Sequence, residues 1–359
     1  MEYNNENNKI NIFKEKRIYS FDAFRLIFCI SIFLNHCTFF KDSICGDKVF
    51  ERLFHNGRFG VTFFFIVSAF CIYKGYSGRK IEYFNFVWNR VKKIYFLYIS
   101  TMIYVALYRM ANGDTVFTIL GQLVLSATML QSLTVKYWGI LNSVGWYLST
   151  LFIMYLFSPL MIKLVDKING KLISVISLIL VCIIPFIDYV IFDLSNKGII
   201  GLETANLLNY IFPIYWIPIY LLGMLSAKWK EININATVQE IFVLAFVFVC
   251  YYLGLSCGGL VNRYKSVLYV IACIMLIYVF SMEKGIVSTC LSNSVLAKMG
   301  GWSTEIYLIH YIVIYYGGME LFGQTSTTIL GAIIECISLL IITCAIGVLW
   351  RKIYNGVKK

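Results

Sequence analysis

Two side chains that could do chemistry lie in the first hydrophobic stretch of the chain, Ser20 to Phe40. Arg25 carries a permanent positive charge and His36 a titratable imidazole, and the length and composition of the stretch predict a membrane-spanning helix. Eleven positions separate the two residues, so on a helix they fall within about 20° of each other and roughly 16 Å apart along the axis. One side of a single helix can therefore present a cation to an anionic ligand and, further along, a base for proton transfer.

Both residues also have a purely structural interpretation. Arg25 could extend to the lipid headgroups, and His36 could hydrogen-bond to a neighbouring helix. A second set of polar residues occurs late in the chain, where Ser303, Tyr307 and His310 are spaced to share one helical face and Glu305 lies in the same stretch. His310 either supports an active site or forms a structural hydrogen bond, and composition alone leaves these interpretations open.

Composition predicts the class of protein in which these residues act. Hydrophobic residues make up 59% of the 359 positions and charged residues only 14%, with a mean hydropathy of +0.74. A soluble globular protein carries about a quarter charged residues, so we expect an all-α polytopic membrane protein of about ten transmembrane helices. Hydropathy predicts these spans near residues 18–40, 58–77, 94–110, 144–165, 171–190, 207–227, 238–256, 265–282, 300–320 and 328–350.

The formal net charge of +12 is explained by membrane topology, and no nucleic-acid partner is expected. Most Lys and Arg residues outside the spans fall on one side, which the positive-inside rule assigns to the cytoplasm. Both termini are then cytoplasmic, with tails at 1–17 and 354–359 and one transmembrane domain at 18–353. Residues 116–130 are apolar but short, so we expect a re-entrant or interfacial helix there.

The remaining reactive residue types give no further site. The eleven cysteines are scattered without a C-x-x-C pair or a histidine spacing suited to zinc, so they are expected to be small core residues, with no metal site. His55 is expected to be a solvated loop histidine. Arg90, Lys92 and Lys93 form a basic run that either anchors a span at the cytoplasmic face or binds a polyanion. Gly60 and Ser68 are small positions that allow close helix packing.

Several of these stretches resemble the integral-membrane acyltransferase-3 family, enzymes that move acyl groups, often acetyl, onto sugars. The pattern Arg25-x10-His36 is similar to the family's signature. The run from Gly60 to Phe70 is similar to Gly-Val-x-x-Phe-Phe-x-x-Ser-Gly-Phe, with Ala69 in place of the usual glycine. Three further elements match in part, namely Arg90-Val-Lys92 where Arg-x-Arg is common, Trp146-Tyr-Leu for Trp-x-Leu, and the Ser303, Tyr307, His310 pattern.

The resemblance implies an O-acyltransferase, most often an O-acetyltransferase, of the bacterial inner or plasma membrane. It implies acetyl-CoA or another acyl-CoA as co-substrate, a glycan or lipid-linked sugar as acceptor, and contact with membrane lipids. His36 would be the general base, and the CoA phosphates would be bound by Arg25, Arg90, Lys92 and Lys93, although a lysine at 92 lacks the bidentate fork of arginine. Substrate contact or support would come from Ser68, Trp146, Ser303, Glu305, Tyr307 and His310. Direct transfer and an acyl-histidine intermediate both stay open, as does a homo-oligomer.

The main alternative is a secondary transporter or flippase for a glycan or small anion. It would use Arg25, Glu305 and the two histidines as a substrate and proton path, in which Glu305 and His310 form either a proton relay or a counter-ion pair with Arg25. Its sequence mark would be paired half-helices in an inverted repeat. The sequence does not show that pattern.

Overall fold

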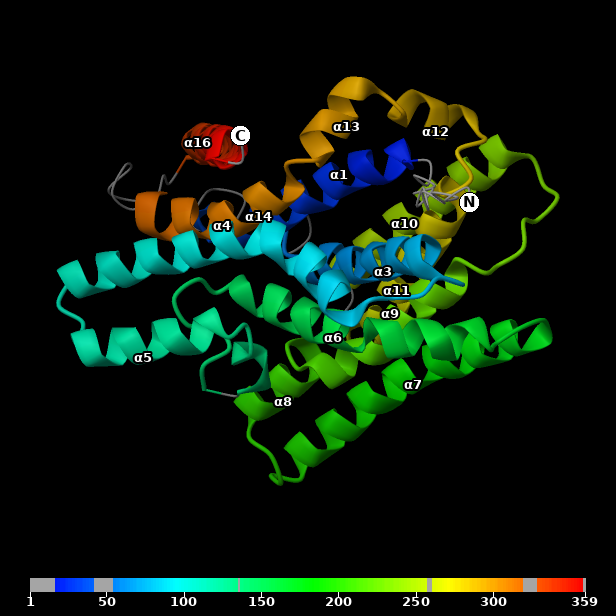
Figure 1. The fold of residues 1–359 in the computed structure, drawn as a ribbon, viewed down its shortest axis with the longest axis horizontal. Helices are drawn as coiled ribbons and strands as arrows, with labels where there is room; N and C mark the ends of the chain where they lie inside the picture. The colour runs from blue at the N-terminus through cyan, green and yellow to red at the C-terminus, as the bar shows by residue number, and fades with distance from the viewer. Residues whose placement is uncertain (1–16, 42–53, 135, 257–259, 319–327, 358–359) are drawn as a thin grey trace, which may run out of the picture.

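The chain folds into helices throughout the part that the computed structural model describes, residues 17–41, 54–134, 136–256, 260–318 and 328–357 (Figure 1). The helices are α1 (Tyr19–His36), η1 (Thr38–Lys41), α3 (Gly57–Tyr76), α4 (Tyr83–Ala111), α5 (Val116–Ala127), η2 (Gln131–Leu133), α6 (Gly145–Asp166), α7 (Lys171–Asn196), α8 (Leu202–Tyr210), α9 (Pro213–Ser226), α10 (Ala236–Ser256), α11 (Leu260–Phe280), α12 (Ile286–Leu291), α13 (Ser294–Gly300), α14 (Ser303–Ile312), the π-helix η3 (Val313–Gly317) and α16 (Ile329–Val357). The predicted tail at 1–17 lies outside the described residues except for its last position. Residues 354–357 of the predicted C-terminal tail continue α16.

Seven helices in the described part are long and apolar enough to cross a membrane, so the protein is a polytopic membrane protein. They coincide with seven of the predicted spans and comprise α3, α4, α6, α7, α8 with α9, α10 and α16. The other three predicted spans contain α1, α11 and α14 with η3. Asp22 and Arg25 lower the mean hydropathy of α1, which has only 18 residues, and α14 ends after 10 residues, where the π-helix begins.

Two helical segments differ from a simple span for physical reasons. Residues 116–127 form a helix of only 12 residues, too short to cross a bilayer core of about 30 Å. The stretch predicted as one span near 207–227 is divided into α8 and α9, and Pro213 is the first residue of α9. A proline lacks the backbone N–H that would continue the preceding helix but fits the first helical position.

The central helix is α3, which packs against α1, α6, α9 and α11. In its apolar window 67% of the residues are buried, against 17% in α7 and in α10, which therefore present most of their surface to lipid. A Cβ at Gly60 would lie 3.0 Å from the carbonyl oxygen of Phe28 and 2.8 Å from a side-chain carbon of Ile32. The glycine thus allows α1 and α3 to touch, which confirms its predicted packing role.

The first helix lies among the segments that carry the other candidate residues. It contacts α3, α13 and α14, and Figure 1 shows it beside α13 and α14 although these come nearly 300 residues later. The Cys29 thiol donates to the carbonyl oxygen of Ser303, 3.3 Å away, and so links α1 to the start of α14. This packing brings the two ends of the sequence together around one site.

Candidate active site

The two histidines singled out in the sequence lie side by side, His36 at the end of α1 and His310 on α14. Their ring centroids are 5.2 Å apart with an angle of 48° between the rings. His310 is almost fully buried, with 1% of its surface exposed, whereas His36 is half-buried. The third histidine, His55, is exposed but close enough to His36 for an electrostatic interaction.

The buried imidazole of His310 is held in a defined orientation. Its Nδ1 atom lies 3.2 Å from the carbonyl oxygen of Ile306, and a carbonyl can only accept, so Nδ1 carries the proton in this contact. Its Nε2 atom is then an acceptor, and it has no hydrogen-bond partner among the residues that the structure describes. The pair therefore includes one anchored imidazole with a free lone pair and one half-buried imidazole.

Aromatic side chains surround the two imidazoles. The rings of Tyr311 and Tyr315 lie 5.5 Å and 6.5 Å from the His36 ring, and the Tyr307 ring lies 5.8 Å from that of His310. The Tyr307 hydroxyl donates to the carbonyl oxygen of Val144 at 3.0 Å, which fixes this ring against the start of α6. The predicted common face of Ser303, Tyr307 and His310 is present, and Ser303 is buried at the end far from His36.

Trp146, expected near the acceptor, is packed inside an aromatic cluster. Only 6% of its surface is exposed, and its ring lies 4.8 Å from Tyr210 and 6.3 Å from Trp216. Its other ring neighbour is Tyr147, which in turn lies 5.2 Å from Tyr307. The tryptophan therefore lies among the residues behind the histidine pair, with most of its surface covered by the described part of the chain.

The other predicted cations divide into two groups. Arg25 and Arg90 both lie near the Cys71 thiol and the Tyr155 hydroxyl inside the bundle. Ser68 lies at the same place, its hydroxyl 3.2 Å from that of Tyr155. Together these five residues form what we call the arginine site.

The two arginines at this site are held differently. Arg25 pairs with Asp22 at 2.9 Å and contacts the Cys71 sulfur at 3.8 Å. Arg90 rests on the rings of Tyr76 and Phe86, 5.2 Å and 5.8 Å from their centroids. Its Nε atom is buried and has no hydrogen-bond partner within the described part of the chain. A guanidinium supported by rings in this way keeps its donors available to an anion.

Lys92 and Lys93 do not join the arginine site. Two residues along a helix turn the side chain by about 200°, so Lys92 points away from Arg90, and its ammonium group bonds to the side chain of Asn89. Lys93 is exposed. The basic run thus supplies one interior cation and two cations on the outside of α4.

Glu305 is paired with a different arginine from the one that the transporter interpretation requires. One of its carboxylate oxygens lies 3.2 Å from Nε of Arg351 on α16, and Arg351 also donates to the carbonyl oxygen of Gly301 at 2.8 Å. Arg25 is paired with Asp22 instead. Glu305 therefore joins α14 to α16, and the expected Glu305–Arg25 counter-ion pair is not formed.

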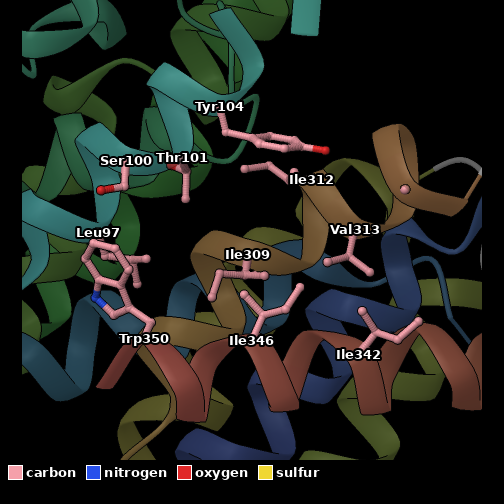
Figure 2. A pocket seen from close by; sticks show the side chains of 11 residues that line it. Leu97, Ser100, Thr101, Tyr104, Ile309, Ile312, Val313, Ile342, Ile346 and Trp350 are labelled. Atoms are coloured by element: carbon pink, nitrogen blue, oxygen red, sulfur yellow. The ribbon is translucent and has the colours of Figure 1, made fainter. Parts of the chain in front are cut away.

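An apolar cavity of about 320 Å³ lies on another side of α14 (Figure 2). It is lined by residues of α4, α14, η3 and α16, including Tyr104, Ile312 and Ile346, and by none of the predicted site residues. Two of its three hydroxyl groups already donate to the backbone, Ser100 to Phe96 and Thr101 to Tyr98, and the third belongs to Tyr104. The cavity offers hydrocarbon contact and no charged group.

The comparison with known families decides the class of this site. Residues 18–349 match the family model described as an acyltransferase domain, of the acyltransferase-3 group. The chain belongs to the acyltransferase-3 family. A curated relative, acyltransferase MdmB of Streptomyces mycarofaciens, is 23% identical over 337 residues, which cover 86% of this chain and 82% of the relative. No solved structure matches the chain. The resemblance read from the sequence is thereby confirmed, and the histidine pair and the arginine site both lie within the family's domain.

Three residues at or beside the arginine site, Asp22, Cys71 and Tyr155, have no functional role predicted from the sequence. Asp22 could have been found, because it precedes Arg25 by three positions and such residues are neighbours on a helix. Cys71 and Tyr155 come from α3 and α6 and approach Arg25 only through packing. The sequence offers no signal for these two contacts.

Proposed function

We propose that this membrane acyltransferase transfers an acyl group, most simply acetyl, from acyl-CoA to a hydroxyl group of a glycan or lipid-linked glycan. The observation that carries the proposal is the pair formed by His36 and His310 inside an acyltransferase-3 domain. His36 is half-buried and can be reached by a substrate, whereas His310 lies behind it with an anchored ring. We therefore assign the role of general base to His36 and a supporting role to His310.

His36 and the two proposed substrates account for every bond and proton in the reaction. His36 takes the proton of the acceptor hydroxyl as that oxygen attacks the thioester carbonyl carbon. The carbon–sulfur bond then breaks, and the CoA thiolate leaves with the proton returned from the imidazolium. The pKa of an imidazole lies near the working pH, and a positioned base of this kind contributes about 10² to 10⁴ in rate. The alternative route passes through an acyl-histidine intermediate, in which the acyl group is transferred first to His36 and then to the acceptor hydroxyl.

The donor is proposed to bind at the arginine site. Clustered guanidinium groups suit the phosphates of CoA, since each can form paired, charge-assisted hydrogen bonds. Arg25 and Arg90 are the cations that the fold brings together, and the buried Nε of Arg90 offers a donor without a protein partner in the described chain. Lys92 and Lys93 would act at longer range, by attracting the polyanion to the cytoplasmic face.

The placement in the membrane follows from the distribution of charge. With both termini in the cytoplasm, as the positive-inside rule favours, Arg25 lies on α1 toward the cytoplasm and His36 toward the outer face. Acyl-CoA would then enter from the cytoplasm of a bacterial inner or plasma membrane. The acceptor would approach His36 from outside.

A direct test measures the transfer of a labelled acetyl group by the purified protein, instead of a cellular phenotype. Protein reconstituted in nanodiscs is given acetyl-CoA labelled in the acetyl group, with a panel of sugars and polyprenyl-linked glycans. Transfer of label and release of free CoA are then measured for the wild type and for His36→Gln. We expect both signals to fall by about 10² to 10⁴ in the variant, while binding of CoA is retained.

The matched control is His55→Gln, the same exchange at a nearby exposed imidazole, for which we expect less than a tenfold change. Folded wild-type protein that neither binds CoA nor releases it with any acceptor would contradict the proposal. Equal losses in the two variants would remove the assignment of His36 as the base.

A further inference from the structure

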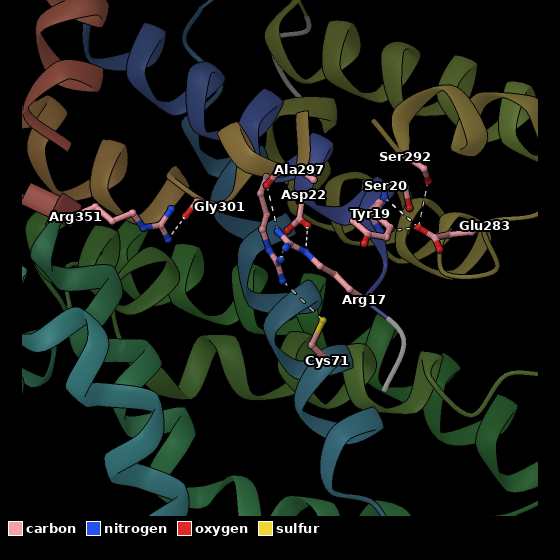
Figure 3. A network of polar contacts seen from close by, with 11 residues as sticks. Arg17, Tyr19, Ser20, Asp22, Cys71, Glu283, Ser292, Ala297, Gly301 and Arg351 are labelled. Atoms are coloured by element: carbon pink, nitrogen blue, oxygen red, sulfur yellow. Dashed lines mark hydrogen bonds and ion pairs between the residues drawn. The ribbon is translucent and has the colours of Figure 1, made fainter. Parts of the chain in front are cut away.

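The cytoplasmic end of α1 is anchored by residues from distant segments (Figure 3). The Glu283 carboxylate accepts hydrogen bonds from the backbone N–H groups of Tyr19 and Ser20, at 2.6 Å and 3.3 Å. The Ser20 hydroxyl also donates to the carbonyl oxygen of Phe280 at 2.9 Å. Since the first N–H groups of a helix have no partner within it, a carboxylate placed there satisfies them and is favoured by the helix dipole.

The next turn of α1 is in direct contact with the end of α13. A Cβ at Gly300 would lie 1.9 Å from the carbonyl oxygen of Asp22, so only a glycine permits this approach. The backbone of Asp22 is therefore fixed from two directions, by the anchored helix end and by α13. The Asp22 side chain is therefore attached to a backbone that is held in place.

The Asp22 carboxylate is shared between two arginines. One oxygen accepts from Nη1 of Arg25 at 2.9 Å, and the other accepts from Nε of Arg17 at 2.7 Å. Arg17 also donates from Nη2 to the carbonyl oxygen of Ala297 in α13, 3.2 Å away. The carboxylate is nearly inaccessible, with 4% of the side chain exposed, whereas the Arg25 side chain is 30% exposed. Each oxygen of Asp22 therefore orients one guanidinium group.

This arrangement leaves Arg25 with unused capacity toward the arginine site. Its second terminal nitrogen contacts the sulfur of Cys71 at 3.8 Å, and a thiol is a weak acceptor. Two guanidinium groups face one carboxylate, so the set retains a positive charge. A guanidinium held on one edge by a carboxylate presents its other edge in a fixed direction, which suits an incoming phosphate.

We propose that Asp22 is a positioning residue for the acyl donor, holding Arg25 so that its free edge meets the phosphates of CoA. The inference rests on the proposed function, since it assumes an acyl-CoA donor. It assigns a role in catalysis to a carboxylate that touches neither substrate nor the reacting atoms. Arg17 extends the same chain of contacts to α13.

The test compares acetyl-CoA, which carries the phosphates proposed to bind at this site, with a donor that lacks the whole phosphorylated nucleotide. Acetyl-CoA and S-acetyl pantetheine share the thioester, but the second lacks the pyrophosphate and the nucleotide phosphate. We expect wild-type protein to prefer acetyl-CoA in kcat/KM, and Asp22→Asn to lose that preference by about 10- to 100-fold, as misplacement of a binding group by about 1 Å can cost 10². The loss should appear in KM for acetyl-CoA, with transfer from S-acetyl pantetheine little changed.

Three further variants separate positioning from stability. Asp22→Glu restores the carboxylate and should recover part of the preference, and Arg17→Gln should reduce it by less than Asp22→Asn. The matched control is Asp193→Asn, the same exchange in the exposed pair that Asp193 forms with Lys197 at 2.6 Å, and it should leave the preference unchanged. Thermal unfolding of each variant shows whether it is folded.

The outcomes distinguish this inference from the proposed function. Wild-type protein that transfers acetyl from neither donor would overturn the proposed function. Transfer with a preference for acetyl-CoA that survives in folded Asp22→Asn would overturn the role of Asp22 alone, as would a wild type that shows no preference. Equal losses with both donors in Asp22→Asn would show a structural role and also reject the inference.

Discussion

The two ends of α1 hold their functional side chains by different forces. Arg25, near the N-terminal end, is oriented by the shared carboxylate of Asp22. His36, at the C-terminal end, is surrounded by the rings of His310, Tyr311 and Tyr315. Charge-assisted hydrogen bonds are short and directional, whereas ring contacts restrict space more than direction. A binding cation gains from a fixed direction, while a base must change its hydrogen-bond partner as it takes and returns a proton.

The largest expected effect is at the C-terminal end of α1. We expect His36→Gln to lower transfer by about 10² to 10⁴, because glutamine fills the space without acting as a base. Transfer of labelled acetyl by the wild type and the variant tests this, and a folded variant that transfers at the wild-type rate would contradict it.

At the N-terminal end of α1 we expect Arg25→Lys to raise the KM for acetyl-CoA by about 10- to 100-fold. The lysine keeps the charge but loses the fork that bonds to Asp22 and a phosphate together, and hydrogen bonds to charged groups contribute about 1.5 to 3 kcal/mol each. Direct binding of CoA provides the measurement. An effect confined to kcat would move Arg25 from donor binding to the chemical step.

A milder change at the arginine site sharpens the comparison. Tyr155→Phe removes the hydroxyl that lies 3.2 Å from that of Ser68 and near both guanidinium groups. We expect the KM for acetyl-CoA to rise by roughly 2- to 10-fold, which corresponds to one neutral hydrogen bond of about 0.5 to 1.5 kcal/mol. Tyr95→Phe serves as control, since its hydroxyl bonds to the carbonyl oxygen of Ala127. A larger rise in KM for the control than for Tyr155→Phe would show that the effect comes from altered packing.

The smallest effect is expected for the exposed cations of α4. Lys93→Gln should change the KM for acetyl-CoA less than twofold at physiological salt, because an exposed charge is screened within about 8 Å. Arg90→Gln should have a larger effect at every salt concentration, since part of its guanidinium is buried. Measuring the KM for acetyl-CoA of both variants over a series of salt concentrations tests whether the two cations act differently. Equal changes in KM would show that the basic run binds the donor as one unit.

The sequence predicted an all-helical membrane protein and placed Arg25 and His36 on one helix, because membrane spans and helical faces follow from local composition. It failed where partners come from other helices. The placement of Trp146 inside an aromatic cluster depends on Tyr210 and Trp216 of the α8–α9 region, which hydropathy cannot locate. Helical geometry alone predicts that the side chains of Lys92 and Arg90 point in different directions. It does not predict the pairing of Glu305 with Arg351, since that contact requires α16 to lie against α14.

The contact between Arg17 and Ala297 also has a consequence for synthesis, because 280 positions separate the two residues. A ribosome that adds about 5 to 20 residues per second needs roughly 15 to 60 s to cover that distance. During this interval α1 has emerged with Asp22 and Arg25, but its support from α13 does not yet exist. The contacts that fix Arg17 and Asp22 therefore form only after α13 has been synthesised, although both arginines that share the carboxylate are made long before it.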